Sequence, residues 1–520
     1  ATAAAAVDWL AAALKSDGTA LLLYSVGATV YAVVRSSGTW GTPTAWSNSV
    51  ATVTGLACIH QDDFDVMVTG TEAQGDAKVW TVIYGDGFSQ PVGAWSALME
   101  LTTASAGSGV EFRAPSLAYP DVFRISFVEK YTGTQAYARP YFTYSPATAF
   151  FVSNLWREPF PFDLASEYGL ALAYSGGYAW LSNPGGVWRA SLTTPTLDVT
   201  ADVLELTAED GPRGGRLRLA LRNDDGRYLD LETGANAVIC LGSEVRVSPG
   251  YVTSAGSQAS DGPAYWIDGW EYTSAPGEAV LVLHARDGWA LLEGWRARRQ
   301  YAWAKGEKNV FQLLAFVCAR AALEFASLGS STTITDFYPG FTVHPGENGA
   351  AAVRRLLAMV PDLLLFRGHF AYVKDPLATE ASAYAYGTDH AIRRGRYGTG
   401  SRQANRIQAF GDGLLVEAFE WDSIEDLYDR LRQLSDLNLD TVALAQDRAA
   451  AELRREAIGS VTGEVVVPTN CGQELYDVVD ITDAAAGLAA AKRRLVGLAL
   501  RYNASGARAA YEQRLLLGAV

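Results

Sequence analysis

The sequence predicts a mainly β protein with an α+β part, in which a β-propeller-like domain comes first. Short runs of β-branched and aromatic residues, separated by Gly, Asp, Ser and Pro, fill the first third of the 520 residues. Alternation of apolar and charged side chains, the strand pattern, continues in the middle third. Apolar residues at helical spacing appear only after residue 300.

A change in composition divides the chain near residue 190. Residues 1–190 hold 9 basic and 15 acidic side chains, whereas residues 191–520 hold 33 and 42, giving a net charge of −15. Eight of the 14 tryptophans lie in the first segment. A charge-poor, tryptophan-rich segment before a more ordinary remainder predicts separate domains. We expect four parts, at 1–190, 191–300, 301–400 and 401–520.

The first segment contains runs typical of strands and a loose internal repeat. The runs are ALLLYSV from Ala20, TVYAVVRS from Thr29, FDVMVTG from Phe64, KVWTVIYG from Lys78 and FRISFVEK from Phe123. Segments that begin at Gly55, Ser116 and Gly169 share a strand, a turn and a second strand. Antiparallel repeats of about 40–50 residues are typical of propeller blades, and about four such units fit here. An irregular β-sandwich is the alternative.

The middle third is predicted to form hairpins. In GRLRLALR from Gly215, leucines alternate with arginines, which gives a strand one buried and one solvated face. The Asn-Asp-Asp-Gly segment at 223–226 predicts a tight turn, because Asp-Gly suits a positive φ. A second hairpin begins at Tyr265 and turns at 275–277, whereas the Ser/Gly/Ala-rich segment 250–263 is predicted to be a long loop.

Apolar periodicity predicts four helices in the last 220 residues. They cover 310–321, 353–360, 424–431 and 441–457. Pro361 ends the second helix, and Ser423 with Asp426 is placed like a capping box at the start of the third. Strands are predicted at 464–468, 475–483, 493–503 and 509–520. The last part is therefore α+β.

No motif for catalysis, cofactor binding or metal binding occurs, and we assign no catalytic, cofactor-binding or metal-ligating residue and no cofactor. Walker A, GxGxxG, HExxH and GxSxG strings are all missing from the sequence. The histidines lie far apart and are expected to be structural or on the surface: His60, His284, His344, His369 and His390. The cysteines have neither disulfide-framework nor metal-cluster spacing: Cys58, Cys240, Cys318 and Cys471.

Two acidic groups each have two interpretations. Asp62, Asp63 and Asp65 could supply oxygen ligands to a hard cation, but Asp also favours turns and a strand follows directly. We therefore favour an inter-strand turn. The 223–226 segment lacks the downstream glutamate of a calcium loop, so we expect a hairpin tip.

The aromatic residues of the first segment suit sugar binding or core packing. Flat Trp and Tyr faces stack on sugar rings, but a propeller also places aromatic side chains between its blades. For each Trp we favour core packing, and for the domain as a whole we favour binding of a glycan or a protein over catalysis.

The acidic balance argues against a protein whose main role is to hold phosphate backbones. No secretory signal is expected at the start of the sequence. The longest weakly polar run, 20–34, is too short to span a bilayer, so we expect no membrane span.

From about Pro195 to Val520 the sequence resembles the hub protein of a phage tail tip or baseplate, a family shared with contractile injection systems. Three passages carry the resemblance. The first, from Leu197, has an alternating strand that ends at an Asp-Gly-Arg-Tyr turn. The second, from Phe341, resembles a small α/β module. The third, from Gly463, contains valine-proline, asparagine-cysteine-glycine and aspartate-valine-valine steps.

The resemblance implies hub-type β-barrels with an α+β insert, and a homotrimer whose two barrels per subunit form a pseudo-sixfold ring. It also implies a virion protein at the tail tip or baseplate that contacts tube or distal tail, tape-measure and fibre or tip proteins. DNA would pass through the ring only as cargo, and an acidic wall would not trap it. Hub proteins usually begin with their first barrel, so the preceding 190 residues are an additional domain, either a head that contacts a host-surface glycan or protein or a collar-like decoration.

We therefore expect a structural protein and not an enzyme. A glycan-binding, lectin-like protein is one alternative, and a glycosidase or cell-wall hydrolase is another. Neither alternative accounts for the hub-like region.

Overall fold

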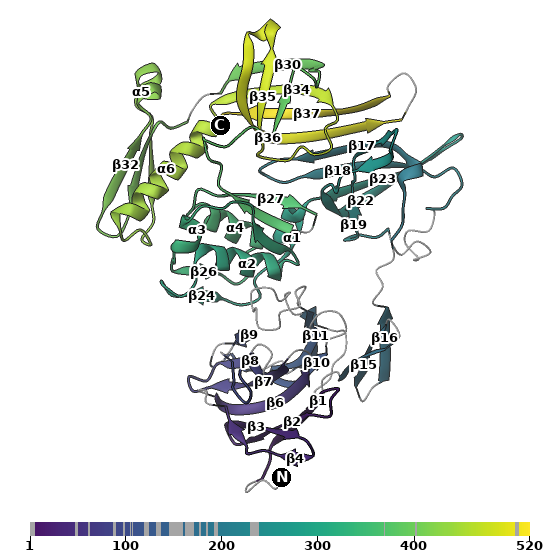
Figure 1. Ribbon diagram of the computed structural model, residues 1–520, viewed down its shortest axis with the longest axis vertical. Helices are drawn as coiled ribbons and strands as arrows, with labels where there is room; N and C mark the ends of the chain where they lie inside the picture. The colour runs from purple at the N-terminus through teal and green to yellow at the C-terminus, as the bar shows by residue number, and fades with distance from the viewer. Residues whose placement is uncertain are drawn as a thin grey trace. The chain divides into compact units, whose positions relative to one another are not determined.

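The computed structural model (Figure 1) divides into two compact units, 1–194 and 195–520, which we describe separately. The structure describes residues 6–46, 50–60, 63–86, 90–96, 99–104, 106, 108–118, 124–131, 137–144, 160–161, 171–175, 178–183, 186–191, 196–228, 239–368, 370–400, 403–504 and 509–520.

Unit 1 contains antiparallel sheets, each built from strands that are consecutive in the chain. The first has β1 (Trp9–Leu14), β2 (Ala20–Val26), β3 (Thr29–Ser36), β4 (Thr39–Trp40) and β5 (Thr44–Ala45). The second has β6 (Val50–His60), β7 (Phe64–Glu72), β8 (Ala77–Tyr84) and β9 (Met99–Ala104). The third has β10 (Val110–Ala118), β11 (Arg124–Tyr131), β12 (Tyr137–Tyr144) and β13 (Phe160–Pro161). The fourth has β14 (Ala171–Ser175), β15 (Tyr178–Asn183) and β16 (Gly186–Ser191).

The strand–turn–strand repeat is confirmed. Its three copies form the hairpins β6–β7, β10–β11 and β14–β15, and each hairpin provides the first two strands of its sheet. The strand β7 is buried on both faces, because the first and third sheets pack on opposite sides of the second. Consecutive sheets packed face to face are a feature of propeller blades. Closure of these sheets into a propeller stays a prediction.

Trp46, Trp80 and Trp95 pack in the core between the first two sheets, as favoured from the sequence, whereas Trp9 and Trp40 are exposed. Trp46 and Trp80 are buried and meet edge to face, with ring centroids 6.4 Å apart. Trp95 lies against Trp46 at 5.9 Å. The position of the Trp156 side chain falls outside the described residues.

Unit 2 begins with a barrel-like set of antiparallel strands. Its elements are β17 (Val203–Asp210), β18 (Arg216–Arg222), β19 (Glu244–Arg246), β20 (Gly250–Thr253), β21 (Gly256–Ala259), β22 (Ala264–Ala275) and β23 (Glu278–Arg286), preceded by the 3-10 turn Thr200–Asp202. The predicted alternation in β18 is confirmed: its leucines are buried and its arginines are exposed. Gly226, with φ of +73°, and Gly277, with φ of +80°, occupy the predicted turns.

The prediction of a long loop at 250–263 is wrong. This segment forms the short hairpin β20–β21, which turns at Ser254 and Ala255, and Gly256 directly after the turn has a φ of +104°. Two distant contacts hold it: the Tyr251 hydroxyl donates to the Thr469 carbonyl at 2.7 Å, and the Gly250 N–H donates to the Tyr511 hydroxyl at 3.0 Å. Its composition is typical of a loop because almost all of its side chains are exposed.

Two α/β modules follow and share one core. The first contains α1 (Gly288–Gly294), β24 (Tyr301–Trp303), α2 (Val310–Arg320), β25 (Glu324–Ser327), α3 (Thr333–Asp336), β26 (Phe341–Val343), α4 (Gly349–Leu357), β27 (Leu363–Arg367) and β28 (Phe370–Lys374). The second contains β31 (Arg406–Phe410), β32 (Leu415–Phe419), α5 (Trp421–Leu427), β33 (Leu431–Ser435) and α6 (Val442–Ile458). The helices predicted near 310, 353 and 441 are confirmed.

The predicted capping box at Ser423 is wrong. The helix α5 begins two residues earlier, at Trp421, and its N-cap residue Glu420 makes no side-chain capping bond. The helix stops at Tyr428, where φ is +59°, and Leu431 already belongs to β33. The apolar residues that predicted one helix therefore belong partly to a helix, α5, and partly to a strand, β33.

The closing barrel contains β29 (Tyr384–Tyr386), β30 (Arg394–Thr399), β34 (Val461–Pro468), β35 (Val478–Asp483), β36 (Leu488–Asn503) and β37 (Ala510–Gly518), with a 3-10 turn at Ala484–Ala486. With these strands the chain is mainly β with an α+β part, so the predicted fold class is confirmed. The boundaries at 300 and 400 stay predictions.

One antiparallel pairing joins the two barrels of unit 2. Residues Glu205–Asp210 of β17 pair with Leu498–Asn503 of β36, and we call these paired segments the seam. The seam produces one continuous sheet, in the order β19-β22-β23-β18-β17-β36-β37-β34-β30 (Figure 1). The two barrels keep separate apolar cores beneath it.

Neighbouring leucines on β37 provide a matched test of this burial. Leu515 is fully buried, whereas Leu516 is 37% exposed on the other face of the sheet. Leu515→Ala should lower the free energy of unfolding of unit 2 by about 2–5 kcal/mol, because it removes buried methyl groups and leaves a cavity. Leu516→Ala should cost less than about 1 kcal/mol. Denaturant titration of both variants checks the difference, and equal losses would contradict the assigned faces.

Candidate functional surface

The continuous sheet presents one face to the barrel cores and the other outward. Residues directly opposite in an antiparallel sheet share a face. Arg218 pairs with Thr207, Thr207 with Arg501, and Arg501 with Glu512, so one polar row crosses the seam. We call this outward side the polar face.

The polar face is rich in arginine, although the protein is acidic. Among the described residues its arginines include Arg216, Arg218, Arg222, Arg246, Arg286, Arg394, Arg396, Arg501 and Arg514. Its glutamates include Glu205, Glu209, Glu244, Glu271, Glu278, Glu464 and Glu512. The acidic channel wall that the resemblance implies stays a prediction.

Ion pairs neutralise part of the polar face. Arg218 lies 2.9 Å from Glu205, and Arg394 lies 3.0 Å from Glu464. Three exposed arginines of this face have no carboxylate at ion-pair distance among the described residues: Arg216, Arg396 and Arg501. The face thus combines charge-paired ladders with a few unpaired cations.

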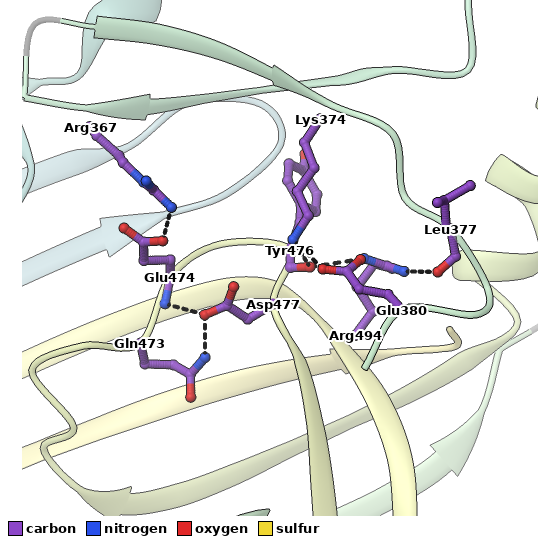
Figure 2. A network of polar contacts seen from close by, with 9 residues as sticks. All are labelled: Arg367, Lys374, Leu377, Glu380, Gln473, Glu474, Tyr476, Asp477 and Arg494. Carbon is purple, nitrogen blue, oxygen red and sulfur yellow. Dashed lines mark hydrogen bonds and ion pairs between the residues drawn. The ribbon is translucent and has the colours of Figure 1, made fainter. Parts of the chain in front are cut away.

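A buried arginine ties the first α/β module to the closing barrel (Figure 2). The Arg494 side chain, on β36, is 0% exposed. Its guanidinium donates to Glu380 at 2.8 Å, to the Tyr476 carbonyl at 2.9 Å and to the Leu377 carbonyl at 2.8 Å. Lys374, at the end of β28, lies 2.5 Å from the same Glu380 carboxylate. Burial would raise the pKa of Glu380, but the bonds from Lys374 and Arg494 outweigh it and the pKa is lowered.

A second contact lies beside this one. Arg367, at the end of β27, points toward Glu474 and forms an ion pair with it. Asp477 accepts from the Glu474 N–H at 3.0 Å and from the Gln473 side chain at 2.7 Å. Burial raises the pKa of both Glu474 and Asp477. The hairpin β27–β28 is therefore fixed against segment 473–477 by side chains and not by strand pairing.

Within the acidic group of unit 1, Asp63 lies in the turn before β7, as favoured from the sequence, and Asp65 lies in β7 itself. Asp63 is 2% exposed and accepts from the Asp86 N–H at 2.8 Å and the Gln90 N–H at 3.1 Å. Asp86 in turn contacts His60 at 2.9 Å and Lys15 at 2.8 Å. Asp62 lies outside the described residues.

The described histidines and cysteines are not brought together into a site. His390 bonds to the Tyr384 hydroxyl and the Pro468 carbonyl, and His284 lies on the polar face near Glu271. His344 lies in the turn before α4, and His369 is outside the described residues. No group of three potential metal ligands occurs among the described residues, and the four cysteines are free. Within the same residues, no helix is long and apolar enough to cross a membrane.

The sequence analysis missed Arg494 and its partners. Those partners come from positions more than 100 residues earlier, Leu377 and Glu380, and from Tyr476. The available signal was an arginine beside apolar residues in a predicted strand, which also describes an ordinary exposed position.

Removing the buried guanidinium should destabilise the join between module and barrel. Arg494→Met should lower the free energy of unfolding by about 3 kcal/mol, because two carbonyls and one carboxylate lose a buried donor. The matched control is Arg246→Met, since Arg246 is 64% exposed and pairs with Glu244. That change should cost less than about 1 kcal/mol. Thermal unfolding of the two variants tests this, and a neutral Arg494→Met would show that the network contributes nothing.

No family model and no curated protein sequence matches this chain. Among solved structures, the chain is similar to a tail protein from Neisseria meningitidis MC58, with 13% identity, a TM-score of 0.47, and coverage of 64% of this chain and 94% of that one. The 43 kDa tail protein of prophage MuSo2 from Shewanella oneidensis has 13% identity, a TM-score of 0.41, and coverage of 66% and 98%. The E. coli c3393 protein, described as a type VI secretion component similar to T4 tail proteins gp27 and gp5, has 12% identity, a TM-score of 0.39, and coverage of 61% and 73%. Phage tail proteins and a type VI secretion component are thus among the solved structures that this chain resembles.

Proposed function

We propose that this chain is a structural protein of a phage tail tip or baseplate, in which unit 2 forms a homotrimeric hub. The observation that carries the proposal is the seam, which joins two barrels of one chain into a single sheet. Three copies would place six barrels around one axis, the arrangement that the sequence resemblance implies.

The two ends of the continuous sheet support assembly with further copies. Its edge strands are β19 and β30, and the outer edge of an edge strand carries N–H and C=O groups that are free to pair. The exposed β30 has small residues at Gly395 and Gly398, which let another backbone approach closely. Edge-to-edge contact would continue the sheet from one copy to the next.

The polar face supports a role beside passing DNA. The arginines that pair with glutamates would attract DNA little, because their charges are neutralised. The unpaired Arg216, Arg396 and Arg501 would contact DNA phosphates weakly, and salt would reduce this attraction. We propose that this face borders the channel. Such a surface suits DNA as cargo and not tight DNA binding.

Unit 1 is proposed to contact the host surface or a neighbouring tail protein. The first strand, β1, exposes Trp9 (39%), Leu10 (63%) and Leu14 (71%). Apolar side chains gathered on one exposed strand are typical of interaction sites. The chemistry of the partner is a glycan or a protein, as the sequence analysis expects.

The assembly is tested by the mass and symmetry of the purified full chain. Light scattering across a range of concentrations should give three times the chain mass of 55.8 kDa, and negative-stain images should show threefold particles. Since obligate assemblies depend on concentration, the light-scattering series should extend to micromolar protein. Tail-like particles isolated from lysates should also be checked for the presence of the chain. A monomer at every concentration that is also missing from such particles would contradict the proposal.

A further inference from the structure

The short helix α5 exposes large apolar side chains at one end of the second α/β module (Figure 1). Trp421 is 62% exposed, Leu427 is 38% exposed, and Tyr428, the residue directly after the helix, is 84% exposed. Large apolar side chains gathered on one exposed segment are typical of interaction sites. We use the term α5 surface for the side chains of Trp421, Asp422, Glu425, Asp426, Leu427 and Tyr428.

The Trp421 ring is held in place by stacking. It lies on the ring of Phe419, with ring centroids 4.7 Å apart and the two planes inclined by 9°. The Arg406 guanidinium carbon lies 5.4 Å from the centroid of the same Phe419 ring. Because one face of Trp421 rests on Phe419 while the side chain stays largely exposed, its other face is open to a ligand. Among aromatic side chains, the face of tryptophan attracts cations most strongly.

The buried Asn405 fixes the backbone that carries the α5 surface. Its side-chain amide donates to the Ser423 carbonyl at 3.1 Å and to the Tyr428 carbonyl at 2.8 Å, and its oxygen accepts from the Arg430 N–H at 2.8 Å. These bonds hold Tyr428 at a φ of +59°, which non-glycine residues rarely adopt and which is found most often at functional sites. The α5 surface is therefore preorganised, which lowers the entropy that binding must remove.

Three carboxylates of the α5 surface are exposed and have no cationic partner within the described residues: Asp422, Glu425 and Asp426. The nearby Arg406 pairs instead with Asp429, at 2.9 Å. Asp422 lies three and four positions before the other two carboxylates, a spacing at which like charges on a helix repel each other. Glu425 and Asp426 also lie in the last turn, where the helix dipole disfavours negative charge. This arrangement is unfavourable in the free chain, and a cationic partner would relieve it.

We propose that the α5 surface binds a partner protein through an arginine or lysine side chain that is flanked by apolar residues. The cation would lie over the open face of Trp421 and pair with the carboxylates of α5. The apolar neighbours of the cation would pack against Leu427 and Tyr428. A sugar would use the aromatic rings but would leave Leu427 and the three negative charges without partners, so the composition of the surface favours a protein. The proposal does not rest on the hub assembly, because all the residues involved belong to one chain.

Three labelled peptides test the recognition by fluorescence polarisation with the full chain. The first contains arginine and leucine, the second has glutamine in place of arginine, and the third has serine in place of leucine. The Arg/Leu peptide should bind at least about tenfold more tightly than either of the others, because it alone offers both the charge and the apolar contacts. Equal binding of the Arg/Ser peptide would show general attraction to an acidic protein, and equal binding of the Gln/Leu peptide would show no recognition of charge. Either result would overturn the proposal.

Substitution of the exposed tryptophan assigns the site. Trp421→Ala should weaken binding of the Arg/Leu peptide at least about tenfold, since tryptophan at the centre of an interface carries a large share of the affinity. Trp40→Ala is the matched control, because Trp40 is also exposed but lies in unit 1, and it should change the affinity less than about twofold. Equal affinity of the Trp421→Ala variant and the parent protein would overturn the assignment.

Two triple variants with the same change in net charge test the carboxylates. Neutralising Asp422, Glu425 and Asp426 as Asn, Gln and Asn should weaken binding of the Arg/Leu peptide at least about tenfold. It should not lower the Tm, because it removes like-charge repulsion within α5. The control variant neutralises three exposed carboxylates elsewhere in unit 2 that form no ion pair within the described residues: Asp261, Glu278 and Asp389. Equal loss of affinity in the two triple variants would overturn the role of the α5 carboxylates.

Two other occupants of the α5 surface would give different results. Self-association that is lost in Trp421→Ala and kept in Trp40→Ala, without binding of the Arg/Leu peptide, would identify a second copy of this chain. Binding of maltohexaose without binding of the peptide would identify a glycan. Each result would overturn the proposal, whereas peptide binding that requires both Trp421 and the α5 carboxylates supports it.

Discussion

The antiparallel pairing at the seam is the interaction on which unit 2 depends. It joins residues 205–210 to 498–503, so almost the whole of unit 2 lies in the loop that it closes. The entropy of closing a loop grows only slowly with its length, by about 0.6 kcal/mol for each doubling. A short ladder supported by two barrel cores can therefore hold the ends together. The polar row that crosses the two barrels follows from this pairing, whereas side-chain contacts fix the first α/β module against the closing barrel.

Continuity of the sheet has two consequences on its opposite sides. On the outward side, register places arginines and glutamates of five strands in common rows, which no single segment of the sequence would reveal. On the inner side, the two cores remain separate, and polar residues such as Asp210 lie at the seam beside apolar ones such as Leu498 and Leu500. The Arg494 network lies on the other side of β36, because the neighbouring Leu495 is the residue that packs in the closing core.

The sequence predicts what depends on near neighbours and misses what depends on distant ones. The leucine and arginine faces of β18 were predictable because alternation is local. The hairpin at 250–259 was not, since Thr469 and Tyr511 hold it from more than 200 residues away. The helix near Ser423 was misplaced because one apolar spacing continued across Tyr428 into a strand. The turn at Asp63 was predicted correctly, because Asp favours turns locally. The arginines of the polar face were not predictable from the net charge, because the net charge is an average over the whole chain.

Hydrogen exchange at the seam tests the account most directly. If β17 and β36 form one ladder, amides in peptides covering 205–210 and 498–503 should exchange slowly and at matching rates, as cooperative units do. These amides should be as protected as the amides in the part of the closing barrel where β36 pairs with β37. Fast exchange of 205–210 together with slow exchange in β37 would show two separate barrels and would contradict the continuous sheet.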